Sequence, residues 1–294
     1  MKIGLLHNPG AGHGKRTIAE LTRLFNEAGH QVLSASTKGK RWMELLAEPI
    51  ERVIISGGDG TVSKVVPLLV GKNLPFHILP LGTANNIARC LDQIQSVERF
   101  VSAFDLARLR KLDLGRVAGL PRRKTFVEAV GVGVLVELMQ DMAGMKEPEK
   151  ANPSKRLAHA LDHCRAISED YAGVHCQLFI DDQKVFGRFL LVEIMNTTHV
   201  GPGLALAPNA DPADGLMEVV CVRDDHREQW CLYLDQLRSG AEVAAPFEAR
   251  TCRTVEFVSV KAPVHADSKI GSPTARVRTW LEPDALKFFD LGDK

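Results

Sequence analysis

The sequence predicts a fold of two parts: an N-terminal α/β part built on a parallel sheet, and a C-terminal part of antiparallel strands. Three observations support this prediction. The chain has 294 residues, 45% hydrophobic and 25% charged, which is typical of a soluble globular protein with two domains. Short apolar runs alternate with amphipathic stretches through the first third of the chain. After about residue 112 this alternation gives way to β-rich runs.

The first part is predicted to alternate strand and helix from its beginning. Lys2–His7 is a short apolar run that predicts a strand, and residues 17–28 carry apolar side chains at helical spacing. Gly29 is placed to end that helix. The remaining elements expected here are strands at 31–35, 52–55 and 76–79, and helices at 41–47, 61–70 and 85–90. Strict alternation of this kind predicts a parallel sheet with helices on both faces.

The second part is predicted to be mainly antiparallel. Its β-rich runs are residues 125–136, 174–180, 187–195, 215–222 and 254–262, and its expected helices are 155–168 and 227–238. Few helices separate the strands, which favours an antiparallel sheet or sandwich. We place the first domain at residues 1–115, with a return of the chain at 281–294, and the second domain at 116–280.

Composition excludes several classes of partner and location. The 37 Lys and Arg against 36 Asp and Glu give a net charge of +1, so no overall field favours nucleic acid as a partner. Local basic excesses occur at residues 1–41 and 108–124, and the second is interpreted as a solvated face. The six cysteines lack metal-binding spacing and no run of 18 apolar residues occurs, so we expect buried thiols in a cytoplasmic protein.

Three glycine-rich turns carry the strongest functional signal. They span residues 8–15, 57–61 and 81–86, and each follows a predicted strand and precedes a predicted helix. The carboxyl ends of parallel strands are where ligands bind in open α/β sheets, and glycines let backbone N–H groups approach a phosphate. One such turn alone is usually a connector. Three at equivalent positions, one with a carboxylate suited to Mg²⁺, favour a phosphate donor, although none matches the dinucleotide or P-loop pattern.

These turns resemble the nucleotide-site signatures of a known family. Asn8-Pro9-x-x-Gly12-x-Gly14, the Gly-Gly-Asp-Gly-Thr run at 57–61 and the Pro-Leu-Gly-Thr-Ala-Asn run at 80–85 resemble the diacylglycerol kinase catalytic-domain family, which includes bacterial lipid kinases and sphingosine kinases. The resemblance continues at 129–133, 201–203 and 207–216. NAD kinases share the Gly-Gly-Asp-Gly-Thr run, whereas the stretch at 82–89 favours the lipid kinases.

The resemblance implies a fold and an activity. The fold would be an α/β ATP-binding domain followed by an antiparallel β-sandwich domain that takes the lipid. The activity would be ATP- and Mg²⁺-dependent phosphorylation of a lipid hydroxyl, such as that of diacylglycerol, in phospholipid biosynthesis. Peripheral membrane contact and a homodimer stay open as partners. Two alternatives remain: a catalytically weak nucleotide- or lipid-binding homologue, and an NAD-kinase-like enzyme.

The same resemblance implies binding residues. Those expected to contact ATP are Asn8, Gly12, Gly14, Thr37, Gly57, Gly58, Asp59, Gly60, Thr61, Val62, Ser63, Gly82, Thr83 and Asn85. Asp59 would orient Mg²⁺-bound phosphates, a role compatible with capping the helix that follows it. A second Mg²⁺ would be held by Asp211, Asp214 and Leu216 through a carboxylate and backbone carbonyls. A plain Asp-Gly turn is an equal alternative there.

The sequence departs from the family where the proton acceptor is expected. Relatives carry Asp-Gly-Glu late in the second domain, and the matching residues here are Asp267-Ser268-Lys269. Lys269 accepts no proton unless its pKa is strongly lowered, so either Asp267 takes over as base or turnover is lost. On an extended strand the two side chains would share a face, and Lys269 would either hold Asp267 ionised or pair with a substrate phosphate. The catalytic candidates are therefore Asp59, Asp267 and Lys269.

Overall fold

A computed structural model describes residues 1–14, 16–144, 152–260, 262–273 and 276–290. The chain forms two compact units. Unit 1 is Met1–Leu112 with Asp284–Lys294, and unit 2 is Asp113–Pro283. The chain leaves unit 1 within the long strand β5 (Arg108–Ala118) and returns to it within β15 (Val277–Asp290). The boundaries expected from the sequence, at 115 and 281, lie inside the same two strands.

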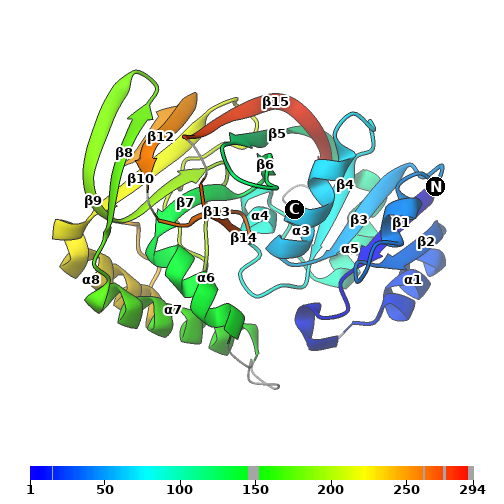
Figure 1. The fold of residues 1–294 in the computed structure, drawn as a ribbon. Coiled ribbons are helices and arrows are strands. Elements are labelled where there is room, and N and C mark those ends of the chain that lie inside the picture. Colours follow the sequence, from blue (N-terminus) through cyan, green and yellow to red (C-terminus); the bar gives the residue numbers. More distant parts are fainter. Residues whose placement is uncertain (15, 145–151, 261, 274–275, 291–294) are drawn as a thin grey trace. The chain divides into compact units, whose positions relative to one another are not determined.

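Unit 1 contains the parallel sheet that was predicted (Figure 1). Its strands are β1 (Lys2–His7), β2 (Gln31–Ser36), β3 (Arg52–Gly57) and β4 (Phe76–Pro80). They lie side by side in the order β2-β1-β3-β4, all parallel, and the end of β15 pairs with β4 at Phe288 and Phe76. The helices are α1 (Ile18–Glu27), α2 (Trp42–Leu45), α3 (Asp59–Val65), α4 (Asn86–Cys90) and α5 (Val97–Ala103).

The helix ends in unit 1 follow from local chemistry. Thr17 caps α1, accepting from the Glu20 N–H while the Glu20 carboxylate accepts from the Thr17 N–H, which forms a capping box. Gly29 follows the helix with a positive φ of 88°, as a terminating glycine does. The single helix expected over 61–70 is instead α3 followed by a 3-10 helix at Val66–Leu69, because Pro67 has no N–H for an α-helical bond.

Unit 2 is built of antiparallel strands, as was predicted, and it includes strands at 249–252, 264–266 and 269–271 that the sequence analysis did not expect. The strands that lie wholly within unit 2 are β6 (Thr125–Phe126), β7 (Ala129–Gly133), β8 (Val174–Ile180), β9 (Gln183–Met195), β10 (Met217–Arg223), β11 (Ala249–Cys252), β12 (Thr254–Val260), β13 (Val264–Ala266) and β14 (Lys269–Gly271). The first half of β9 pairs with β8, and its second half lies between β7 and β10. β13 pairs with both β7 and β14, and β12 pairs with β8 and β15.

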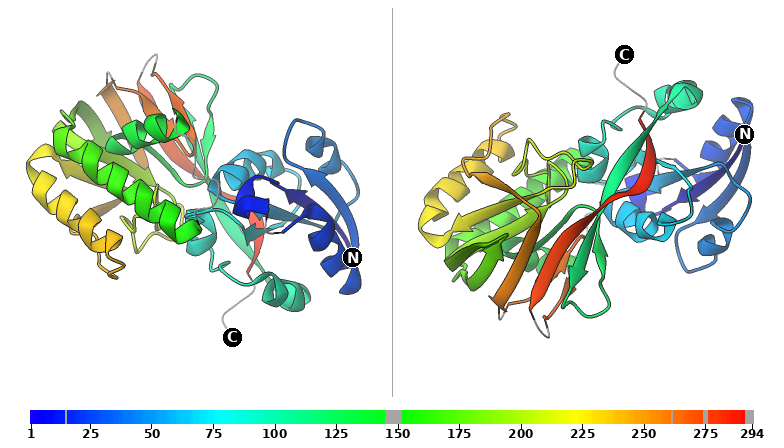
Figure 2. Two further views of the ribbon diagram at one scale, coloured as in Figure 1. Left: turned by 90° about the horizontal axis from the view of Figure 1, so that it is seen from below. Right: turned by 90° about the horizontal axis from the view of Figure 1, so that it is seen from above.

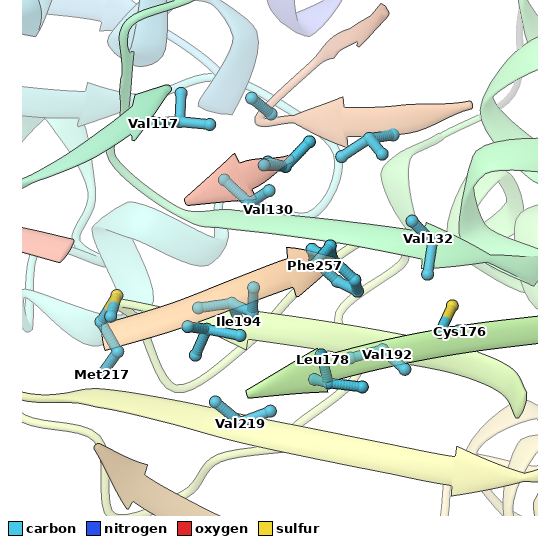
Figure 3. Close-up of a cluster of buried hydrophobic side chains, with 14 of the residues drawn as sticks. Val117, Val130, Val132, Cys176, Leu178, Val192, Ile194, Met217, Val219 and Phe257 are labelled. Carbon is cyan, nitrogen blue, oxygen red and sulfur yellow. The ribbon is translucent and has the colours of Figure 1, made fainter. Parts of the chain in front are cut away.

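Two apolar clusters stabilise unit 2. One lies among the strands and includes Phe257, Val130 and Ile194, whose side chains point into a common core (Figure 3). The other packs α6 (Val134–Gly144), α7 (Pro153–Asp170) and α8 (Arg227–Arg238) against β9 and β10. Helix α6 corrects the sequence analysis, which placed residues 134–136 in a β-rich run. The positive φ of Gly133, 103°, turns the chain from β7 into this helix.

The basic residues of β5 lie beside acidic residues of β15, since the two strands run together (Figure 2). Arg110 pairs with Asp290 at 3.2 Å, Lys111 with Asp284, and Arg116 with Glu282. The interpretation of residues 108–124 as a solvated face is therefore incomplete, because three of these cations have carboxylate partners. No disulfide bond joins any of the six cysteines, all of which lie in the described part of the chain. Within the described residues, no helix is both long and apolar enough to span a membrane.

Candidate active site

The three glycine-rich turns are neighbours in unit 1, as the sequence analysis predicted. They follow β1, β3 and β4, which lie next to one another and point the same way. The carboxyl ends of these strands therefore share one edge of the sheet, which is where ligands bind in open α/β sheets. Hydrogen bonds join the turn after β1 to the turn after β3, and the turn after β3 to the turn after β4. Both links involve residues expected to contact ATP.

The first link joins the turns after β1 and β3. The Asn8 side-chain amide donates to the Thr61 hydroxyl at 3.0 Å, and the Asn8 backbone N–H donates to the Ser56 carbonyl at 2.8 Å. A Cβ on Gly57 would lie 2.6 Å from the Thr61 hydroxyl oxygen, so only glycine leaves room for this packing. Asn8, Gly57 and Thr61 thus shape one wall of the candidate site.

The second link joins the turns after β3 and β4. The Leu81 N–H donates to the Gly57 carbonyl at 2.9 Å, and a Cβ on Gly82 would lie 2.5 Å from the Gly58 Cα. The Asn85 side chain accepts from the Gly82 N–H at 2.8 Å and donates to the Gly82 carbonyl at 3.1 Å. The glycines here permit two backbone segments to touch, in addition to exposing N–H groups.

Asp59 joins these two turns through its carboxylate. Its Oδ1 accepts a hydrogen bond from the Ile87 N–H, in α4, at 3.0 Å. The expected capping of the following helix is thus corrected: Asp59 sits in the first turn of α3, but its carboxylate caps α4. Burial raises its pKa, and hydrogen bonds from backbone N–H groups of residues 85–87 oppose that rise. The residue as a whole is half-buried.

The other residues expected to contact ATP fall into two groups. Gly12 has a positive φ of 61°, Gly14 ends a 3-10 helix, Gly60 is exposed, and Thr83 is half-exposed. Val62, by contrast, is 1% exposed, so only its backbone can face a ligand. The second group also includes Ser63 and Thr37, whose side chains make contacts within unit 1.

The hydroxyl groups of Ser63 and Thr37 donate hydrogen bonds to backbone carbonyls of unit 1. The Ser63 hydroxyl donates to the Asp59 carbonyl at 2.9 Å. Thr37 is buried, and its hydroxyl donates to the His7 carbonyl at 3.4 Å. The sequence analysis did not single out Lys64. Its ammonium group donates a hydrogen bond to the Thr37 carbonyl at 2.6 Å and lies over the ring of Trp42. It anchors the segment that follows β2.

Asp267 lies in unit 2, in the two-residue turn between β13 and β14. Its carboxylate accepts from the Val127 N–H at 3.0 and 3.1 Å and from the Glu128 N–H at 2.8 Å. Its own N–H donates to the Ala129 carbonyl at 2.8 Å. The residue is buried, and this burial raises the pKa of its carboxyl to about 6, against the opposing effect of the hydrogen bonds.

Lys269 is the first residue of β14 and its side chain is exposed. The expectation that it shares a strand face with Asp267 is wrong. Asp267 adopts a positive φ of 50° within the turn, so the two residues are not on one extended strand. The alternation of side chains along a strand therefore does not apply to this pair.

The turn proposed as a second metal site is held by a residue that the sequence analysis missed. Asp211 and Asp214 are exposed, and their carboxylates accept from the Ala213 and Leu216 N–H groups at 3.0 and 2.8 Å. Asp113, on β5, is fully buried and accepts from the Gly215 N–H at 2.7 Å. Its own N–H donates to the Pro212 carbonyl at 2.8 Å.

The donor set limits how a metal could be held. Among the described residues, no group of three His, Cys, Asp or Glu side chains could hold a metal ion. Mg²⁺ is commonly bound by one or two carboxylates together with substrate phosphates and water. Asp59 beside the glycine-rich turns fits that mode, and the turn at 211–216 offers two exposed carboxylates, those of Asp211 and Asp214.

The chain thus combines a parallel sheet whose glycine-rich turns lie at one edge with a unit of antiparallel strands. Residues 2–117 match the family model described as "Diacylglycerol kinase catalytic domain". Residues 140–290 match the "YegS C-terminal NAD kinase beta sandwich-like domain". The chain belongs to the diacylglycerol kinase catalytic-domain family of lipid kinases, as its motifs indicated.

Individual relatives agree with this assignment. The chain is 27% identical over 293 residues to a diacylglycerol kinase of Mycobacterium tuberculosis, covering 92% of this chain and 90% of that one. A diacylglycerol kinase structure from Bacillus anthracis superposes with a TM-score of 0.72 at 16% identity, covering 98% and 96%. An NAD kinase of Archaeoglobus fulgidus in complex with ATP superposes at 0.55 and 14%, covering 98% and 93%. The two structural likenesses bear on the fold alone.

Proposed function

We propose that this protein transfers the γ-phosphoryl group of ATP to a hydroxyl group of a lipid, with diacylglycerol as the first acceptor to test. The observation that carries the proposal is the set of three linked glycine-rich turns around Asp59, in a chain of the lipid kinase family. In the reaction, the acceptor oxygen bonds to the γ-phosphorus, the bond to the β–γ bridging oxygen breaks, and ADP leaves.

The residues of unit 1 would bind and orient the nucleotide. Backbone N–H groups of the turns at 8–14, 57–63 and 82–85 would donate to its phosphate oxygens. Asp59 would hold Mg²⁺, which when bound neutralises charge on the transferring phosphoryl group. Because Asp59 also bonds the Ile87 N–H, its carboxylate is aimed by the fold before any ligand arrives.

Asp267 would accept the proton of the lipid hydroxyl. A carboxyl whose pKa is raised to about 6 is still ionised at neutral pH, and it is a stronger base than an ordinary aspartate. Lys269 is exposed, and an ammonium group has hydrogens to donate but no lone pair with which to accept the proton. In this proposal, Asp267 takes the role of proton acceptor that the resemblance gives to a glutamate at the position of Lys269.

The proposal also keeps a structural Mg²⁺ at the Asp214 turn, and this predicts an effect of chelation. Excess EDTA should lower the melting temperature of the wild type, because a cation bound only by the folded state stabilises it by mass action. Asp214→Asn should melt at the lower temperature with or without EDTA. Differential scanning calorimetry checks both. A wild-type melting temperature that EDTA leaves unchanged would favour the plain Asp-Gly turn.

The activity is tested with purified protein, radiolabelled ATP and Mg²⁺, offering diacylglycerol, other lipid alcohols in detergent micelles, and NAD. Label in a lipid product supports the proposal. Label in NADP would identify the NAD-kinase-like alternative, which the fold shared with the A. fulgidus NAD kinase keeps open. ATP binding in calorimetry without any phosphorylated product would identify the catalytically weak homologue, the alternative that Lys269 suggests.

A further inference from the structure

A buried ion pair in unit 2 spans three adjacent strands. His265 on β13 lies opposite Gly131 on β7, which in turn lies opposite Glu193 on β9. The His265 Nε2 reaches across to the two Glu193 carboxylate oxygens, at 3.1 and 2.9 Å. A Cβ on residue 131 would lie 2.3 Å from both of those oxygens, so glycine is required for the pair to form.

The contacts of the imidazole determine its protonation. Its Nδ1 faces the backbone carbonyl of Asp267 at 3.1 Å, and its Nε2 faces the carboxylate. A backbone carbonyl oxygen and a carboxylate anion can only accept, so with Glu193 as an anion both ring nitrogens carry a hydrogen and His265 is an imidazolium. Both partners are buried, His265 at 3% exposure and Glu193 at 0%, and the carboxylate raises the pKa of His265 against the effect of its burial.

We propose that the Glu193–His265 pair is a positioning device for Asp267: it holds the backbone of the turn that presents the Asp267 carboxylate for proton transfer. This rests on the proposed function, in which Asp267 is the base. The pair does not touch the carboxylate itself, so its members are positioning residues. Without the pair, Asp267 would keep its hydrogen bonds to residues 127–128 but lose the restraint on its carbonyl.

The restraint matters because Asp267 adopts an uncommon backbone conformation. A positive φ costs free energy for a residue with a side chain, although Asp tolerates it better than most. The hydrogen bond from the His265 Nδ1–H fixes the carbonyl of that residue. The turn is then held from both ends, by His265 at the carbonyl and by the Ala129 carbonyl at the Asp267 N–H.

The charges around His265 set the direction of the pH effect. β9 contributes Glu193, the turn contributes Asp267, and β7 has no titratable side chain. Lys269 on β14 is exposed, and the Arg123 guanidinium lies 3.5 Å from the Ala266 carbonyl. Glu128 is buried beside the turn. The positive charges of His265 and Arg123 both lower the pKa of Asp267, so loss of the imidazolium charge must raise it.

The test is Glu193→Gln, which keeps the shape of the side chain and removes the charge that holds the imidazolium. The expected result is a fall in kcat of about 10- to 100-fold at neutral pH, the range usual for loss of an orienting partner. The KM for ATP should not change. The acidic limb of the kcat/KM profile should move to higher pH, which a purely structural role would not cause. His175→Gln, an exposed histidine on β8, is the matched control and should behave as the wild type.

A second measurement on the wild type does not depend on the variant folding or on any activity. In ¹⁵N-histidine NMR spectra, His265 should stay doubly protonated well above neutral pH. A neutral His265 ring at pH 7 would overturn the proposal, and so would Glu193→Gln with unchanged kcat and an unmoved acidic limb in an active enzyme. If the wild type itself phosphorylates no lipid, the proposed function fails, while the NMR result still decides whether the charged pair exists.

Discussion

Asp59→Asn should abolish lipid phosphorylation while leaving the fold intact. The substitution removes the charge that would hold Mg²⁺ but keeps an oxygen that can accept from the Ile87 N–H. Loss of such an electrostatic interaction in the transition state typically costs ~10²–10³-fold in kcat, and we expect at least that. The lipid phosphorylation assay gives the rate, and circular dichroism melting reports the fold.

Asp59→Ala separates the two roles of this side chain. It removes the acceptor as well as the charge, so the Ile87 N–H loses its side-chain partner, and we expect about 1–3 kcal/mol lower stability than Asp59→Asn. Asp105→Asn, at an exposed aspartate of unit 1, is the control for loss of one negative charge. Normal turnover by Asp59→Asn would remove Asp59 from the mechanism and leave it as the link between the turns after β3 and β4.

Asp267→Asn should lower turnover by ~10²–10⁴-fold, the usual cost of removing a general base. The amide oxygen can still accept from the Val127 and Glu128 N–H groups, so the turn should persist. In the wild type, activity should rise as pH increases through about 6, because the carboxyl must lose its proton before it can act as base. Asp267→Asn should remove this rise. Steady-state rates from pH 5 to 9 check both expectations.

Lys269→Met is the companion variant and should cost far less activity than Asp267→Asn, since the Lys269 side chain is exposed. If the wild type binds ATP without transferring phosphate, Lys269→Glu should restore some turnover by supplying the acid that relatives carry. Strong wild-type activity that survives Asp267→Asn would contradict both assignments. The role of Asp267 would then be to hold residues 127–128 through its hydrogen bonds.

The parts of the fold that were predictable depend on local pattern. β1, β3 and β4 are short apolar runs that each lead into a glycine-containing turn, and α1 begins at a Thr with Glu three residues later, so their positions follow from spacing and capping. The adjacency of the three turns followed because parallel strands present their carboxyl ends at one edge. That each turn contacts ATP stays a prediction.

Helix α6 was missed because its sequence carries no periodic signal. Residues 129–138 are almost all apolar and rich in valine, and the first turn of α6 is buried on every side, so neither helical nor strand spacing is visible. A short apolar run of this kind is ambiguous between strand and helix. The chain changes direction at Gly133, and α6 begins at the next residue. Gly133 packs closely against β9, because a Cβ on this residue would lie 2.1 Å from the Leu190 carbonyl oxygen.

The missed polar residues are all paired with partners far away in the sequence. Glu193 contacts a residue 72 positions later, and Asp113 contacts Gly215, 102 positions later. No local spacing could show these pairs. A signal was nevertheless present for Glu193: it is a lone carboxylate inside the apolar run at 189–195, and a buried charge without a partner is too costly to persist. Such residues predict that a partner exists, without saying which one.

The return of the chain in β15 has a consequence for biosynthesis. Phe288 completes the sheet of unit 1 beside Phe76, the Phe289 carbonyl accepts from the Gln93 side chain at 3.0 Å, and the Arg52 guanidinium stacks 3.7 Å from the Phe289 ring. These contacts join residues that precede unit 2 in the chain to residues that follow it. During synthesis on the ribosome, this edge of the unit 1 sheet therefore stays open until the whole of unit 2 has been made.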